Sequence, residues 1–284
     1  MILNNKFGYA FYLLARNDWS WKFLTKKEQE KVIADNYIHN NEREDYANPE
    51  KYKDGESIYC NQNPKKTYLG AWLKNELEEQ KPKKVLEIGP GSGFYTKLIL
   101  NVDCVLEYTG LDINNFFLEY IRKGVEEWKN LLLEKRSYNL VNKVIEEFDG
   151  DEYDAIVMMY SIHHIPDRVE LFKKLSKCLK KGGKIYSVDP SHYIPRIRML
   201  IPKIYKEYWP SRHWEKRGNL STHHFCSLGE FKFICKKVHS LQIHNTKFYY
   251  RNEELKKKLM KWGIKSSVAT RWVSNTICAV FVKK

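Results

Sequence analysis

The feature that most constrains this chain is the segment VLEIGPGSGFYT at residues 85–96, a short apolar strand that runs directly into a glycine-rich turn. Glycine occupies every second position of that turn: Gly89, Gly91 and Gly93. Glycine allows the backbone to turn tightly and to approach a ligand closely, although the same spacing also suits a tight turn without a ligand. The dinucleotide fingerprint G-x-G-x-x-G would need glycine at position 94, which is Phe94. An acid inside the strand, Glu87, suits an ammonium or sulfonium ligand better than a pyrophosphate.

Apolar segments alternate with amphipathic segments from Lys83 onward. Strands are expected at 84–89, 106–113, 153–162 and 184–190, and helices at 95–101, 116–135 and 168–183, the last closed by Gly182 and Gly183. Residues 239–251 and 272–284 are expected to form an antiparallel closing pair. This order predicts an α/β fold, a Rossmann-like, doubly wound and mostly parallel sheet with helices on both faces.

Asp112 ends the second expected strand, beside the glycine turn at the carboxyl edge of the sheet. A carboxylate there can accept hydrogen bonds from both hydroxyls of a ribose, which favours an adenosyl ligand. The alternative is that Asp112 caps the helix that begins near Asn114. The residues alone leave NAD and S-adenosylmethionine open at this point.

Four segments together are more specific: VLEIGPGSGF, LDI, YDAIVMMYSIHHIPD and LKKGGKIYSVDP. In this order, over residues 83–190, they resemble the motifs of the class I S-adenosylmethionine-dependent methyltransferases. The resemblance implies S-adenosyl-L-methionine as the cofactor, with its methionine part passing close to the three glycines and its amino group near Glu87. It also implies that Asp112 holds the ribose, that Ile113 flanks the adenine and that Val144 or a neighbour contacts the adenine amine.

The resemblance places Tyr160 beside the transferred methyl group, and two pairs of histidines lie where the acceptor is expected. Either His163 or His164 could serve as the base for a protonated nucleophile, or the pair could pack the loop after the strand. His223 and His224 could line the acceptor pocket. We expect no metal site, because no further ligands recur at useful spacing.

Three parts of the chain follow from these motifs. Residues 1–66 are predicted to be a helical cap segment with a capping-box pattern at Thr25 and Glu28, and residues 67–284 to be the methyltransferase domain. Within that domain, residues 191–228 are predicted to be an inserted lid. Its stretch 194–208 mixes apolar and basic residues and could either pack on the core or contact a membrane surface.

The charge of the chain is unevenly distributed. Its net charge is +14, yet residues 1–189 hold 29 Lys and Arg against 30 Asp and Glu, whereas residues 190–284 hold 20 against 5. This excess indicates either an anionic partner or a solvated lysine-rich surface. We predict a cytoplasmic enzyme that methylates a small-molecule or lipid-like acceptor. An RNA methyltransferase and a non-catalytic, cofactor-binding activator subunit are the alternatives.

Overall fold

The structure, a computed structural model, describes residues 21–33, 67–128, 136–150, 152–165, 167–191, 226–249, 253–266 and 276–284. The elements in these ranges, in chain order, are α3 (Lys26–Ile33), α5 (Tyr68–Gln80), β1 (Lys84–Ile88), α6 (Phe94–Leu100), β2 (Glu107–Asp112), α7 (Asn115–Trp128), β3 (Ser137–Asn142), η4 (Ile145–Glu147), β4 (Tyr153–Met159), η5 (Ile162–His164), α8 (Arg168–Cys178), β5 (Leu179–Pro190), α10 (Leu228–Lys237), β6 (Leu241–Tyr249), α11 (Glu253–Lys261) and β7 (Thr276–Lys283). None of the helices within these ranges has the length and apolar character needed to cross a bilayer.

The strands in the described ranges form a seven-stranded sheet in the order β3-β2-β1-β4-β5-β7-β6. The first five of these strands pair in parallel, and β7 runs antiparallel between β5 and β6. This is the doubly wound order 3-2-1-4-5-6 with one antiparallel strand inserted near its edge. The predicted fold class and the antiparallel closing pair are therefore confirmed.

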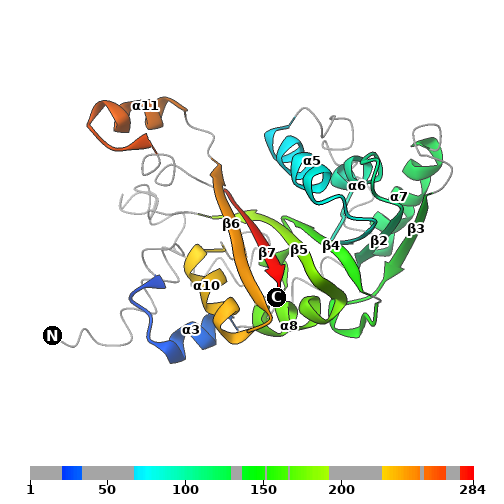
Figure 1. Cartoon of the computed structure of the whole chain (residues 1–284), viewed down its shortest axis with the longest axis horizontal. Coiled ribbons are helices and arrows are strands. Elements are labelled where there is room, and N and C mark those ends of the chain that lie inside the picture. Colours follow the sequence, from blue (N-terminus) through cyan, green and yellow to red (C-terminus); the bar gives the residue numbers. More distant parts are fainter. Residues whose placement is uncertain are drawn as a thin grey trace, which may run out of the picture.

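Helices cover both faces of this sheet (Figure 1). Apolar side chains of α5, α6 and α7 pack with Val85 and Val157 on one face, and those of α8 and α10 pack with Leu86 and Ile156 on the other. Neighbouring residues of one strand contribute to opposite faces of the sheet because successive side chains point in opposite directions. Burial on both faces explains why the central strands read as nearly continuous apolar runs.

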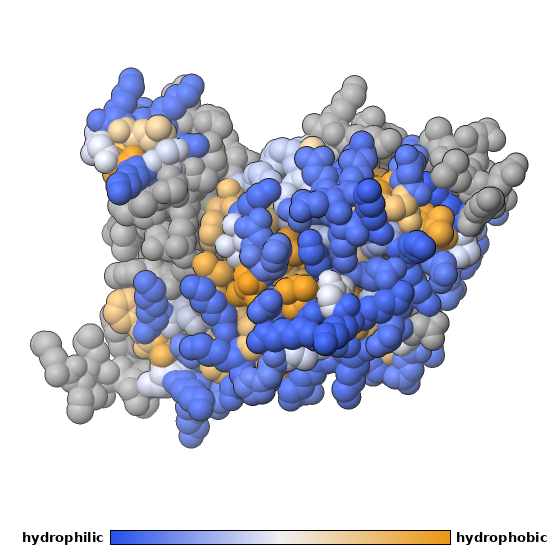
Figure 2. Space-filling model, in the orientation of Figure 1, coloured by the Kyte–Doolittle hydropathy of each residue, from blue (hydrophilic) through white to orange (hydrophobic). Residues whose placement is uncertain are grey.

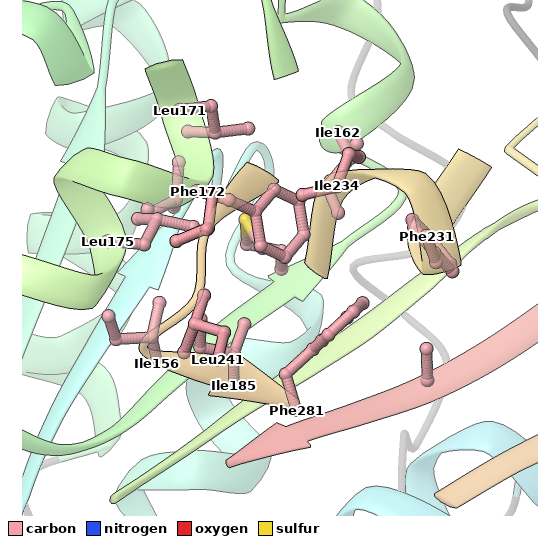
Figure 3. Close-up of a cluster of buried hydrophobic side chains, with 14 of the residues drawn as sticks. Ile156, Ile162, Leu171, Phe172, Leu175, Ile185, Phe231, Ile234, Leu241 and Phe281 are labelled. Carbon is pink, nitrogen blue, oxygen red and sulfur yellow. The ribbon is translucent and has the colours of Figure 1, made fainter. Parts of the chain in front are cut away.

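Three phenylalanines form the centre of the core between α8, α10 and the sheet (Figure 3). The ring centroids of Phe172 and Phe281 lie 4.8 Å apart, and those of Phe231 and Phe281 lie 5.2 Å apart, both pairs in edge-to-face geometry. Such aromatic pairs stabilise a core beyond their buried area. The three rings thus join α8 and α10, which are far apart in the sequence, to β7.

Residues 21–33 pack against α10. The indole of Trp21 lies against Gly229, where a Cβ atom would come within 2.4 Å of the ring, and Lys237 donates a 2.7 Å hydrogen bond to Glu30. The predicted capping box is present: Glu28 N–H donates to Thr25 Oγ1 at 3.3 Å, and Thr25 N–H donates to Glu28 Oε2 at 2.7 Å. The helix that this capping box was predicted to open is thus present as α3.

Two local features differ from the sequence prediction. Strand β3 was not expected, because it is an edge strand rich in Ser and Asn whose side chains are at most half-buried. Helix α8 ends at Cys178 rather than at the Gly182–Gly183 pair, and β5 begins at Leu179. Leu179 is fully buried and pairs with Tyr153 on β4, and this sheet pairing ends the helix before the glycines are reached.

Candidate active site

The glycine turn after β1 adopts a backbone that side chains disfavour. Gly89, Gly91 and Gly93 have φ angles of +66°, +52° and +77°. A Cβ atom on Gly89 would lie 2.9 Å from Ser161 Cβ, whereas a Cβ atom on Gly91 would meet nothing within 4 Å. Gly89 is therefore required by the close approach of the segment after β4. The space beside Gly91 is open, as a turn that borders a ligand requires.

Asp112, at the end of β2, is bonded to this turn. Its Oδ2 accepts a 3.2 Å hydrogen bond from Gly91 N–H, and its Oδ1 accepts a 2.9 Å hydrogen bond from Asn114 N–H. Burial raises the pKa of the Asp112 carboxyl to about 6, and hydrogen bonds from backbone N–H groups partly oppose this increase. Asp112 thus fixes the glycine turn and the start of α7, and its contact with a ribose remains a prediction.

Glu87 is fully buried beneath α6. Its Oε2 accepts 2.7 Å hydrogen bonds from the hydroxyls of Thr96 and Tyr108. Burial raises the pKa of Glu87 to about 7, the two hydroxyls partly lower it, and the nearby Asp112 raises it further. Two carboxyl groups whose pKa values are shifted toward neutrality therefore flank the glycine turn, which is typical of functional sites.

The adenine side that the sequence predicted lies at the ends of β2 and β3. Ile113 follows Asp112 and is half-buried, and Val144 is half-buried immediately before η4. Asn142 Nδ2 donates a 3.0 Å hydrogen bond to the Asp112 carbonyl and ties the two strand ends together. The topology thus brings Ile113 and Val144 to neighbouring positions at the same edge of the sheet, and their contacts with adenine remain a prediction.

Tyr160, directly after β4, occupies a strained position on the opposite side of the turn. Its φ angle is +59°, which is rare for a bulky residue and is often found at functional sites. Its N–H donates to the Val188 carbonyl at 2.6 Å, and its hydroxyl lies 3.4 Å from Thr276 Oγ1. These contacts hold Tyr160 between the end of β4 and the start of β7, at the carboxyl edge of the sheet.

The histidine pair after β4 lies in the short helix η5. His164 N–H donates to the Ser161 carbonyl at 3.1 Å, and the side chain of His164 is half-buried. The side chain of His163 lies outside what the structure describes, as do His223 and His224. The assignment of a base therefore stays a prediction.

Ser161 is a candidate site residue that the sequence did not reveal. Its hydroxyl is buried beside Gly89 and has no hydrogen-bond partner among the described residues. A buried hydroxyl without a partner is rare and points to a ligand or water that would satisfy it. No sequence pattern would have singled out this serine, because its position above Gly89 depends on the pairing of β1 with β4.

Two other observations delimit the site. A hollow of about 350 Å³ lies at the other edge of the sheet, where Lys84, Glu107, Ser137 and Tyr153 begin their strands, and it is therefore separate from the glycine turn. Within the described ranges, no three His, Cys, Asp or Glu side chains cluster as metal ligands would.

A family model described as a methyltransferase domain matches residues 64–238. The chain belongs to this methyltransferase family. The matched stretch spans the glycine turn, Asp112, Tyr160 and η5, so the predicted family is confirmed together with its fold.

Individual relatives of this methyltransferase are distant. The demethylmenaquinone methyltransferase of Thermotoga maritima is 26% identical over 140 residues, which are 48% of this chain and 57% of the relative. The highly reducing polyketide synthase Preu5 of Preussia isomera is 25% identical over 133 residues, 44% of this chain and 5% of the synthase. This chain thus spans less than two thirds of the length of both relatives.

A solved structure is similar over almost the whole chain. The plantazolicin methyltransferase BpumL, in complex with SAH, superposes with a TM-score of 0.54 at 17% identity, covering 91% of this chain and 97% of that protein. This likeness confirms the fold of the methyltransferase. The glycine turn, the half-buried Asp112 at the end of β2 and the Ser161 hydroxyl, which has no partner among the described residues, together fit an adenosyl cofactor at the carboxyl edge.

Proposed function

We propose that this methyltransferase transfers a methyl group from S-adenosyl-L-methionine to a small-molecule or lipid-like acceptor. The observation that carries the proposal is the hydrogen bond between Gly91 N–H and Asp112 Oδ2, which joins a ligand-compatible turn to a carboxylate at the next strand end. SAH, the demethylated product of that cofactor, is bound in the similar BpumL structure. Relatives named for demethylmenaquinone and for polyketide synthesis favour a small acceptor over nucleic acid.

The side chains of the site divide the work of such a reaction. When bound, S-adenosylmethionine supplies a methyl group that its positive sulfur makes electrophilic. Asp112 would accept hydrogen bonds from the ribose hydroxyls, and Glu87 would supply negative charge beneath the methionine part. The ring of Tyr160, positioned by its strained backbone, would help to exclude water and to orient the acceptor, since proximity and orientation provide much of the acceleration. Either His163 or His164 remains the predicted base for an acceptor that starts protonated.

Replacing Ser161 with alanine should weaken the binding of S-adenosylmethionine and SAH by about threefold to tenfold, the usual effect of losing one hydrogen bond. Protein stability should not fall, because the substitution removes a buried hydroxyl that has no partner among the described residues. Calorimetric titration measures the affinity, and thermal unfolding of the ligand-free protein measures stability. Unchanged affinity in the Ser161→Ala variant would place the hydroxyl outside the cofactor site.

The affinity for the cofactor should rise with pH between about 6 and 8, by at most tenfold per pH unit. The carboxyl of Glu87, with a pKa of about 7, is neutral at the low end of this range, and ionisation adds an attraction for the positively charged cofactor. Tyr108 and Thr96 donate to the same carboxylate, and Asp112, with a pKa of about 6, adds a smaller increase at the low end.

The Glu87→Gln variant is the control for this pH dependence. It keeps an acceptor for Tyr108 and Thr96, and its remaining pH dependence reports the titration of Asp112 and of the ligand's own amino group. Calorimetry at several pH values, on both proteins, gives the comparison. Parallel curves for the two proteins would exclude Glu87 as the titrating group.

The proposed activity is tested by incubating the purified protein with methyl-labelled S-adenosylmethionine and separate pools of small metabolites, extracted lipids and RNA. We expect label in the metabolite or lipid pool, tight SAH binding and weak NAD binding. Label in RNA alone would replace the proposal by the RNA methyltransferase alternative. Cofactor binding without transfer to any pool would favour an activator subunit. We also propose a cytoplasmic location, since the scattered spacing of the six cysteines favours reduced thiols over a disulfide framework.

A further inference from the structure

Helix α11 ends in a defined cap that presents a tryptophan to solvent. Ile264 N–H donates to the Leu259 carbonyl at 3.2 Å, and Gly263 N–H donates to the Met260 carbonyl at 3.0 Å. With Gly263 at φ +81°, these two bonds form a Schellman motif, in which Leu259 and Ile264 are the positions that usually contact each other. Both of these side chains are half-buried. The cap therefore fixes the last turn of α11. Two other apolar side chains of this turn do not belong to the capping pair and are exposed to solvent.

Those two side chains are Met260 and Trp262, which are 44% and 76% exposed. Trp262 is the most exposed of the large apolar side chains that the structure describes. Figure 1 shows α11 at one end of the molecule, away from the helices that cover the sheet. An exposed tryptophan on an ordered helix end is poorly explained by folding alone, because it adds no core and leaves a large apolar surface in water.

Lysines surround this apolar pair. Lys257, Lys258, Lys261 and Lys265 are exposed, and Figure 2 shows hydrophilic side chains around a small hydrophobic patch over α11. Residues 253–266 hold five lysines against two glutamates, both of which stand at the first two positions of the helix. The negative end of the helix dipole accounts for some cations in the last turn, but not for the apolar pair among them.

We propose that α11 and its cap bind the surface of an anionic lipid bilayer. Trp262 and Met260 would insert at the boundary between headgroups and acyl chains. The aliphatic stems of the lysines would extend along the apolar layer, and their ammonium groups would reach lipid phosphates. Charge complementarity favours this partner, since residues 190–284 carry 20 basic against 5 acidic residues. A nucleic acid would engage the lysines but would leave Met260 exposed, and a second copy of the same basic helix would be repelled.

Flotation of the full-length chain with lipid vesicles tests the proposal. One set contains phosphatidylcholine alone, and the other contains phosphatidylcholine and phosphatidylglycerol in equal parts. We expect binding to the anionic vesicles, little binding to the neutral vesicles, and weaker binding at high salt. The triple variant Lys257→Gln/Lys258→Gln/Lys261→Gln should lose about fivefold in partition coefficient per lysine. The variant Met260→Ser/Trp262→Ala should lose about tenfold.

Matched controls separate this site from general basic charge. The variant Lys177→Gln/Lys181→Gln/Lys236→Gln removes the same charge from exposed lysines elsewhere, and Leu106→Ala removes an exposed apolar side chain that is distant in sequence. Neither control should change the partition coefficient more than twofold, and all variants should bind SAH as the wild type does. The proposal is overturned by absent binding or by equal binding to both vesicle types. It is also overturned if the control lysines matter as much as those of α11, or if Met260→Ser/Trp262→Ala has no effect.

Discussion

The Arg168→Met variant should be destabilised by about 3–5 kcal/mol, the usual cost of removing one partner of a buried ion pair. Arg168, the first residue of α8, donates a 2.6 Å hydrogen bond from Nη1 to Glu230 Oε1, and the two side chains are 1% and 0% exposed. The substitution leaves the Glu230 carboxylate buried without this cation. Chemical denaturation, followed by far-UV circular dichroism, gives the free energy of unfolding of both proteins.

Two further variants define the origin of that loss. Glu230 also accepts a 2.7 Å hydrogen bond from Ser227 N–H in a capping box, a role that glutamine can keep. The double variant Arg168→Met/Glu230→Gln should therefore recover most of the lost stability. Lys173→Met breaks an exposed ion pair with Glu170 on the same helix and should cost less than about 1 kcal/mol. A cost for Arg168→Met as small as that for Lys173→Met would contradict the account.

The ion pair also matters for the position of the site. It joins the start of α8, a few residues after η5, to the first turn of α10. The residue before the N-cap of α10, Cys226, donates from its N–H to the Pro190 carbonyl at the end of β5 at 2.9 Å. The segment after β4, where the transferred methyl group is predicted to lie, is thus connected to the starts of α8 and α10, at which Arg168 and Glu230 are buried. Loss of Arg168 should loosen this region as well as the core.

The parallel sheet could be predicted because its central strands are buried on both faces and read as apolar runs. Strand β3 could not be predicted, since the sequence of an edge strand with Ser137, Asn139 and Asn142 resembles that of a loop. The end of α8 was mispredicted for a related reason. The glycine pair at 182–183 is a strong local stop signal, but the long-range pairing of Leu179 with Tyr153 ends the helix earlier.

The site shows the same division between local and long-range information. The glycines at 89, 91 and 93, visible in the sequence, permit the positive φ angles that the turn adopts. The hydrogen-bond partners of Glu87 could not be predicted from the sequence, because Thr96 and Tyr108 approach it from α6 and β2 only in the folded chain. Local patterns thus located the turn and Asp112, whereas the buried hydroxyls that surround them depend on strand register and helix packing.

Replacing Asp112 with alanine should weaken binding of S-adenosylmethionine and SAH by about 1.5–3 kcal/mol, the usual range for hydrogen bonds to a charged group. The expected loss is larger than that for Ser161 because a carboxylate can accept both ribose hydroxyls. The substitution also leaves the N–H groups of Gly91 and Asn114 without this acceptor. Calorimetric titration of both ligands into the wild type and the variant measures the change.

A second variant distinguishes ligand binding from helix capping, the two roles that the structure allows for Asp112. Asn114 Oδ1 accepts a 2.9 Å hydrogen bond from Phe116 N–H in the first turn of α7, and Asn114 is fully buried. Asn114→Ala should therefore cost about 1 kcal/mol of stability through loss of the cap but should change ligand affinity far less than Asp112→Ala does. If Asp112→Ala lowers only the free energy of unfolding and leaves the affinity for SAH unchanged, Asp112 is a structural residue of the α7 start, and the ribose must be held elsewhere.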